Sequence, residues 1–309
     1  MNANNSHWPR LSFEHDQDTI NTLHLWLQIV GKVRLSQMPW INHSWHAPLY
    51  VTVRGLTTSL MPYGRQAFEI DFDFNAHRLE IATSRGERRS FDLKPMSVAA
   101  FYRKTMRALG DLDIQARIWP MPVEIPDPIQ PFHEDEAQRA YDPEAVERLW
   151  QALLQVQRVF TNFRAGFIGK VSPIHLFWGA FDLAVTRFSG RTAPKHPGGA
   201  PNCADWVMQE AYSHEVSSAG FWPGAGLGEA AFYAYAYPEP DGFRDYPVRP
   251  NAAYYSKELA EFILPYEAVR TADDPEVDLM DFLQSSYAAA ADLAAWDRGG
   301  LERRTHRSR

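Results

Sequence analysis

Two segments of this sequence resemble each other, and the repetition restricts the fold more than any other feature does. Residues 45–54 and residues 178–187 align without a gap and share a Trp, an Ala and an Arg at matching positions. A Gly-Lys pair precedes each segment, at residues 31–32 and 169–170. Several residues that recur in the same order are typical of a duplicated unit. We therefore expect two related halves, with a seam of the kind that often holds a pocket.

The local patterns predict a helix, antiparallel strands and a further helix in each half. Residues 68–74 alternate between apolar and acidic side chains, as a strand with one buried face does. The predicted helices span residues 16–31, 97–110, 142–164 and 274–296. The predicted strands span residues 49–54, 68–74, 77–83, 89–93, 113–119, 175–177, 182–188, 207–217, 231–237 and 262–266. The predicted fold class is α+β, with internally duplicated helix–antiparallel sheet–helix units packed around a shared core.

A proline-rich stretch marks the predicted boundary between the halves. Residues 120–131 contain five prolines, which exclude a helix and favour an extended connector. We expect residues 1–138 to form the first α+β half and residues 139–297 the second. Residues 298–309 are basic and have no apolar stripe, so we expect a disordered tail.

Composition excludes several classes of function. The net charge of −7 argues against a nucleic-acid-binding protein. No apolar run approaches the roughly 18 residues of a membrane span, and the first ten residues lack the apolar core of a signal peptide. The single cysteine, Cys203, excludes an intrachain disulfide and a cysteine-cluster zinc site. We expect a cytoplasmic protein without nucleic-acid or membrane partners, and the oligomeric state stays open.

No cofactor is expected either. The glycines at residues 224–228 lead into a predicted strand, whereas a dinucleotide or phosphate loop leads into a helix. His43 and His46 have a local ligand spacing, and a distant His175 or His214 would be needed to complete a metal site. Because this signal is weak, we predict that no structural metal is required.

Three histidines are the candidates for general acid–base catalysis. His24 lies on the first predicted helix, four residues before Gln28 and eight before Lys32, so the three form one polar stripe on an apolar rod. The stripe faces either a polar cavity or solvent. The predicted strand 207–217 is polar on both faces and carries His214, which is typical either of a wet site or of an edge strand. His175 is the third candidate.

Cations and aromatic side chains are the candidates for ligand binding. Under the duplication Lys32 corresponds to Lys170, and Arg54 corresponds to Arg187. If these cations converge on the seam, they would hold a carboxylate or a phosphate, while Trp178 and Tyr235 would contact the apolar part of the ligand. The alternative is that each cation pairs with a structural carboxylate such as Asp73.

The longest motifs resemble a known family. Residues 8–9, 22–32, 49–58, 163–173, 177–190, 211–224 and 233–239 carry the resemblance. These motifs are similar to those of a bacterial family catalogued as domain of unknown function 5996, over nearly the whole chain. The resemblance implies no reaction and no catalytic residues.

The sequence therefore leads to one functional hypothesis and two alternatives. The leading hypothesis is a small-molecule enzyme that acts on an anionic substrate in an aromatic, cationic pocket between two related halves. The first alternative is a non-catalytic protein that binds a small molecule. The second is a structural or partner-binding protein whose cations form internal ion pairs.

Overall fold

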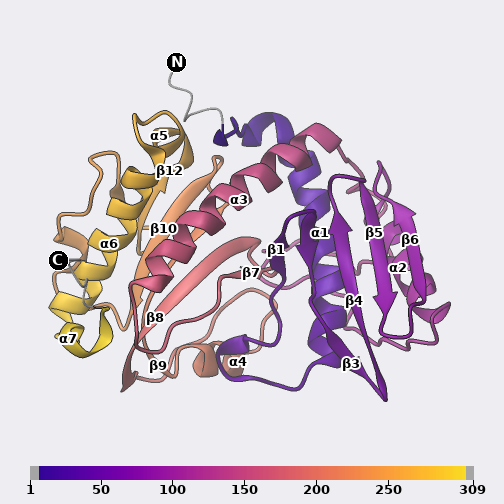
Figure 1. The fold of residues 1–309 in the computed structure, drawn as a ribbon, viewed down its shortest axis with the longest axis horizontal. Helices are drawn as coiled ribbons and strands as arrows, with labels where there is room; N and C mark the ends of the chain where they lie inside the picture. The colour runs from indigo at the N-terminus through magenta and orange to yellow at the C-terminus, as the bar shows by residue number, and fades with distance from the viewer. Residues whose placement is uncertain (1–6, 304–309) are drawn as a thin grey trace, which may run out of the picture.

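The computed structural model describes residues 7–303, and this part of the chain folds into two antiparallel sheets with helices packed against them (Figure 1). The α+β class is therefore confirmed. The helices are α1 (Phe13–Gln37), α2 (Val98–Gly110), α3 (Pro143–Ala165), α4 (Asp205–Ala211), α5 (Tyr266–Arg270), α6 (Pro275–Leu293) and α7 (Arg298–Leu301), with short 3-10 turns η2 (Asn42–Ser44) and η3 (Phe243–Asp245).

The first sheet contains β1 to β6 in the order β1-β2-β4-β5-β6, with β3 also paired to β4. The strands are β1 (Tyr50–Thr52), β2 (Gly55–Thr57), β3 (Met61–Tyr63), β4 (Gln66–Asp73), β5 (Arg78–Thr83) and β6 (Arg88–Asp92). The predicted alternation is confirmed over residues 68–72, because Phe68, Ile70 and Phe72 are buried while Glu69 is exposed; Asp73, which was expected on the exposed face, is buried. The buried face packs against α2, where Phe72 stacks on Phe101.

The second sheet has the order β11-β12-β10-β9-β8-β7. The strands are β7 (His175–Phe177), β8 (Asp182–Thr192), β9 (His214–Trp222), β10 (Ala231–Tyr237), β11 (Tyr254–Ser256) and β12 (Glu261–Pro265). One face of this sheet packs against α3 and α6, which cross in front of it in Figure 1. The opposite face is turned toward segments of the first half.

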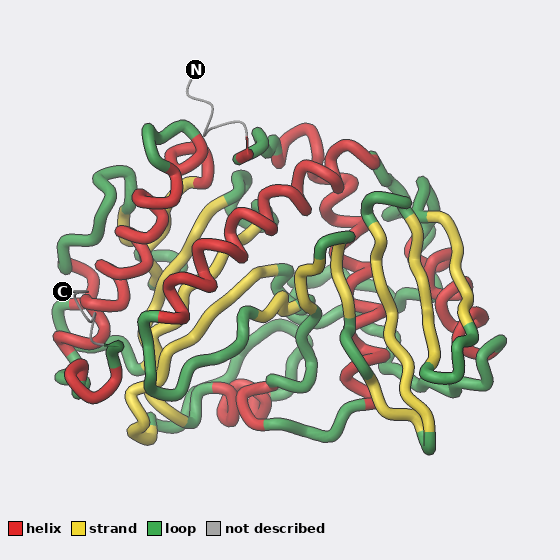
Figure 2. The backbone as a smooth tube through the Cα atoms, in the orientation of Figure 1, coloured by secondary structure: helices red, strands yellow, loops and turns green. Residues whose placement is uncertain are grey.

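The two sheets meet at one backbone bridge. Leu49 and Leu176 exchange two N–H···O hydrogen bonds of 2.9 Å, next to β1 and β7. Most buried apolar residues of both halves form one contiguous core, and Ala231, Tyr233 and Ile263 form a second, smaller cluster. Loops fill the region between the sheets, together with α4 (Figure 2). The predicted domain boundary near residue 138 lies in the connection between α2 and α3 and stays a prediction.

Helix α1 runs six residues past its predicted end at Gly31. Glycine often terminates a helix, but here it permits a close approach. A Cβ atom at Gly31 would lie 2.3 Å from the indole ring of Trp178, so only glycine lets the helix pack on that ring. The packing partner comes from the other half, and the local sequence gave no sign of it.

Two other local predictions were wrong. Residues 207–217 do not form a strand, because α4 ends at Ala211 and β9 begins at His214. The residues of α4 that line the same cavity, Val207, Met208 and Ala211, have the i, i+1, i+4 spacing of a helix. Residues 113–119 form no strand.

The predicted disordered tail was also wrong over its first part. Residues 298–301 form α7, in which Arg298 pairs with Asp292 and Glu302 at 2.8 and 2.5 Å. Glu302 also forms a backbone bridge with Phe167. Residues 304–309 of the predicted tail lie outside the described residues.

The duplication stays a prediction at the level of whole halves, since each half has helices around an antiparallel sheet. The paired cations, however, do not occupy equivalent positions. Lys32 lies inside α1, whereas Lys170 follows the end of α3. Arg54 lies in the turn between β1 and β2, whereas Arg187 lies within β8. None of the helices in residues 7–303 has the length and hydropathy that a membrane span requires.

Candidate functional site

Three adjoining cavities lie where residues of the first half meet the second sheet, and Glu124 lines all three. The acidic cavity, of about 260 Å³, contains Asp182 and Glu261. The proline cavity, of about 800 Å³, is walled by the proline-rich connector. The Lys32 cavity, of about 410 Å³, lies beside α1.

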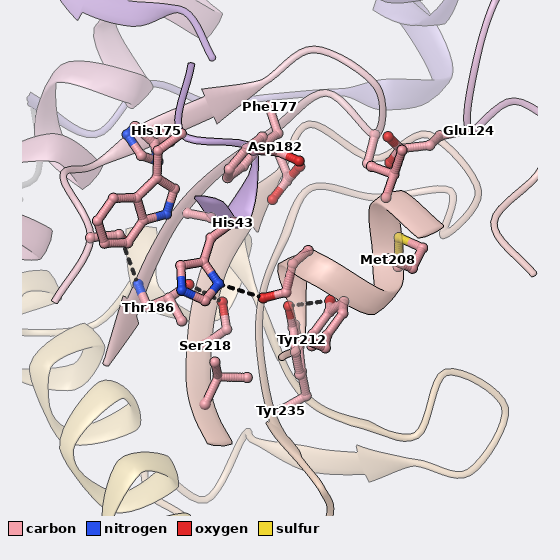
Figure 3. Close-up of a pocket in the computed structure, with 18 of the residues that line it drawn as sticks. His43, Glu124, His175, Phe177, Asp182, Thr186, Met208, Tyr212, Ser218 and Tyr235 are labelled. Atoms are coloured by element: carbon pink, nitrogen blue, oxygen red, sulfur yellow. Dashed lines mark hydrogen bonds between the residues drawn. The ribbon is translucent and has the colours of Figure 1, made fainter. Parts of the chain in front are cut away.

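Strand alternation builds the floor of the acidic cavity. Successive side chains of a strand point to opposite faces of the sheet, so one face of the second sheet collects every other residue of four strands (Figure 3). The residues contributed are Asp182, Ala184, Thr186 and Phe188 from β8, Val216, Ser218 and Trp222 from β9, Tyr233 and Tyr235 from β10, and Glu261 from β12.

The carboxyl groups in this cavity have raised pKa values. Burial raises the pKa of Asp182 to about 7, against a smaller lowering by the hydrogen bond from Tyr233. Burial, followed by the charge of Asp182, raises the pKa of Glu261 to about 8. The carboxyl of Glu124 reaches the cavity space, and burial raises its pKa while the charge of Lys32 lowers it. The pKa values of Asp182 and Glu261 lie within about one unit of neutral pH, which is the range that suits a proton-transferring side chain.

Hydroxyl groups link the floor into a polar network. The Tyr233 hydroxyl donates to Asp182 Oδ2. The hydroxyls of Tyr212 and Tyr235 lie 2.7 Å apart, and burial raises the pKa of Tyr235 to about 12, so this phenol keeps its proton. The network holds Asp182 in one orientation.

The wall opposite the floor comes from η2 and α4. His43 Nδ1 lies 2.8 Å from the carbonyl oxygen of Ala211, to which it donates. Its Nε2 therefore accepts from the Lys170 ammonium at 2.6 Å. Burial lowers the pKa of His43, and the Lys170 charge lowers it further, so the ring is neutral. Both histidine nitrogens are occupied by protein groups, and Lys170 stacks over Trp45 and Phe188 at the rim.

His175 is the one predicted acid–base residue that lines the acidic cavity. It is almost fully buried, and neither ring nitrogen has a hydrogen-bond partner. Burial, followed by the charges of Arg34 and Arg164, lowers the pKa of His175 to about 3. A base this weak is poorly matched to proton transfer near neutral pH.

The other two candidate histidines lie elsewhere. His24 Nε2 lies 3.0 Å from the carbonyl oxygen of Trp178 and 2.8 Å from that of Gly179, so it ties α1 to the segment before β8. Gln28 continues this tie through hydrogen bonds of 2.8 and 2.9 Å with the backbone of Val123. His214 lies outside the acidic cavity, beside His43. His24 also lines the proline cavity, and Lys32 lines the Lys32 cavity, so two of the three residues of the predicted polar stripe face cavities, while His24 and Gln28 also contact Gly179 of the second half.

The two arginines do not face the acidic cavity. Arg54 forms ion pairs of 3.0 and 3.3 Å with Asp73 and Asp71 on the outside of the first sheet. Arg187 lies five residues after Asp182 on β8, so its side chain points to the opposite face of the sheet. There it faces α3 and α6 and stacks over Phe163 and Tyr287. Their convergence on a pocket, expected from the repeat, is therefore incorrect.

Metal ligation finds no support in the described residues. In residues 7–303 no three His, Cys, Asp or Glu side chains are grouped as ligands of one ion. His46 Nδ1 contacts the backbone of Ile41, while His43 is bound as described above.

The carboxyl groups were missed by reasoning from the sequence. Asp182 opens β8 directly before the apolar residues 183–185, and a carboxyl group beside a buried apolar run is a signal of a special environment. The alternating tyrosines of β10 are a second signal, because Tyr233 and Tyr235 share one face. Glu261 opens β12 directly before buried apolar residues and so carries the same signal as Asp182, whereas Glu124 carries no local signal.

The comparisons with known proteins agree with the motifs. A model described as Family of unknown function (DUF5996) matches residues 8–303, and the chain belongs to this family. Among curated proteins and solved structures, none matches the chain.

Proposed function

We propose that the protein is an enzyme that acts on a small organic molecule with a basic nitrogen, held in the acidic cavity. Asp182 and Glu261 transfer protons to and from this molecule. One observation carries the proposal: three carboxyl groups with raised pKa values share one aromatic cavity, and none of them has an ion-pair partner among the described residues.

The raised pKa values favour catalysis over simple binding. A carboxyl group with a pKa near 7 donates or accepts a proton at little cost at neutral pH. The charge of Asp182 is one cause of the raised pKa of Glu261, and the charge of Glu124 is one cause of the raised pKa of Asp182. Coupled carboxyls of this kind provide one acid and one base in the same site.

The charge of the lining favours a basic substrate. No Lys or Arg is among the described residues that line the acidic cavity. An anionic substrate, expected from the sequence, would face the carboxyl groups and destabilise their ionised forms. A protonated nitrogen would instead supply the missing counter-charge, and the rings of Trp45 and Trp222 suit a cation.

The size of the cavity limits the substrate. A volume of about 260 Å³ is at the lower end of the range for ligand pockets, so the part bound here is small. The adjoining proline cavity offers room for a larger substituent or a path of entry.

Isothermal titration calorimetry with benzylamine, benzyl alcohol and benzoate tests the preference for a cation. We expect benzylamine to bind most tightly of the three, and to bind more tightly at pH 8 than at pH 6. Its binding should release protons, which are counted by repeating the titration in buffers of different ionisation enthalpy. Asp182→Asn and Glu261→Gln should each weaken benzylamine binding by about tenfold. Glu69→Gln, which changes an exposed carboxyl on β4, is the matched control.

Two results would contradict the proposal. The first is benzylamine binding that neither variant weakens. The second is benzoate binding that Asp182→Asn abolishes. Incubation of the wild type with a panel of biological amines, followed by mass spectrometry of the products, then separates enzyme from binding protein: conversion lost in Asp182→Asn supports catalysis, and binding without conversion of any amine assigns a binding protein.

A further inference from the structure

The Lys32 cavity is a second site with different chemistry. Lys32 projects from the C-terminal part of α1 and is 5% exposed, yet it lines an open cavity of about 410 Å³. The ammonium lies 5.0 Å from the ring centroid of Trp119 and 5.6 Å from that of Trp178. Within the described chain it has no hydrogen bond and no carboxylate within ion-pairing distance. A buried ammonium in this state lacks a counter-charge.

The walls of this cavity are predominantly flat and apolar. Trp178 is fixed in place, because its Nε1 donates to the carbonyl oxygen of Ala47 at 2.9 Å. On the other side Trp119 is 55% exposed, so one indole is rigid and the other stands at the opening. Trp40 and Trp206 contact each other at the same opening, with centroids 4.7 Å apart. Exposed aromatic side chains gathered around one cavity indicate a ligand with an apolar body.

The charges around Lys32 favour an anion. The other cation that lines the cavity is Arg117, and the carboxyl is Glu124, which is shared with the acidic cavity. Burial raises the pKa of Glu124, which forms no ion pair with Lys32, and burial also raises the pKa of the Cys203 thiol above its ordinary value of 9.0, so the thiol is neutral near neutral pH. Burial lowers the pKa of Lys32 to about 8, which a bound carboxylate would reverse.

We propose that the Lys32 cavity binds a flat, apolar monocarboxylate, with the carboxylate on the Lys32 ammonium and the apolar body between Trp119 and Trp178. A single ammonium and apolar walls match one negative charge on an apolar body, whereas a phosphate dianion would require more donors. The site retains two of the residues that the sequence suggested for an anion, Lys32 and Trp178, and it stands apart from Asp182.

Calorimetry of the full chain with 2-naphthoate tests this site, with 2-naphthylmethanol as the neutral twin and 2-naphthylmethylamine as the cationic twin. We expect 2-naphthoate to bind about tenfold more tightly than the alcohol, because the charge-assisted hydrogen bond to Lys32 is present only in the acid. Lys32→Met should remove this preference and weaken the binding of 2-naphthoate by about tenfold. Lys94→Met changes an exposed lysine and should leave it unchanged.

Further variants keep the outcome decisive. Lys32→Met should retain or raise the melting temperature, because it removes a buried charge that has no partner. If Lys32→Met fails to fold, Trp119→Ala is used in its place. Trp119→Ala should weaken the binding of 2-naphthoate and of 2-naphthylmethanol to the same extent, since Trp119 contacts the apolar body of the ligand. Asp182→Asn should leave 2-naphthoate binding unchanged, which separates this site from the proposed function. Equal binding of acid and alcohol by the wild type, or an unchanged affinity in Lys32→Met, would overturn the proposal.

Discussion

Asp182→Asn should make the protein less sensitive to alkaline pH. Asp182 is 6% exposed and accepts a hydrogen bond from Tyr233, and its pKa is about 7 in the folded protein. In the unfolded chain the same carboxyl ionises near its ordinary value of 3.8. The folded state therefore holds the proton more tightly, and the free energy of unfolding falls as the pH rises from about 4 toward 7.

The magnitude follows from the two pKa values. Between pH 5 and pH 8 the carboxyl lowers the free energy of unfolding by a further 2.5 kcal/mol or so, about 1.4 kcal/mol for each tenfold change in proton affinity. Asparagine has the shape of the protonated acid and never ionises, so this loss disappears in the variant. Removing Asp182 also removes one cause of the raised pKa of Glu261, which acts in the same direction.

Urea unfolding followed by tryptophan fluorescence at pH 5, 6, 7 and 8 measures the effect. From pH 5 to pH 8 the free energy of unfolding of the variant, measured relative to that of the wild type, should rise by about 2–3 kcal/mol. The free energy of unfolding of Glu69→Gln should differ from that of the wild type by the same amount at all four pH values. A difference between Asp182→Asn and the wild type that stays constant with pH would show that Asp182 is already ionised at pH 5, and would refute the acid–base role.

Two substitutions test the packing around the cavities. Arg187→Ala should cost at least about 2 kcal/mol of stability in urea unfolding, because the guanidinium fills the space between Phe163 and Tyr287 and donates to the backbone of Phe163; near-native stability with lost ligand binding would instead place it in a pocket. Gly31→Ala should cost about 2 kcal/mol or more, since its Cβ would overlap the Trp178 ring, and an unchanged melting temperature would show that α1 does not pack on that ring as described.

Sequence reasoning succeeded where structure is local. The alternation of β4 and the Asp-Pro starts of α3 and α6 lie within single elements, so a few neighbouring residues determine them. It failed at residues 207–217, because short apolar segments fit both a strand and a helix until packing selects one. It failed at Gly31 for a related reason, since the ring of Trp178 decides what that position requires.

The candidate site was predicted only in part. The sequence indicated aromatic walls. Among the residues to which it pointed, His175 and Tyr235 line the acidic cavity, and Lys32 and Trp178 line the Lys32 cavity. It assigned the proton transfer to histidines, because an unperturbed imidazole titrates near neutral pH. Burial reverses that assignment, lowering the pKa of His175 and raising that of Asp182.

By itself the sequence determined the α+β class, the family and the segments that carry most helices and strands, because these depend on periodicity and on long motifs. The tertiary structure alone decided which charges face a cavity. Asp182 and Arg187 lie on one strand five residues apart, and the pleat sends them to opposite faces of the sheet. Segments distant in sequence then cover one face with the acidic cavity and the other with aromatic rings, so the environment of each residue is set by its neighbours in space.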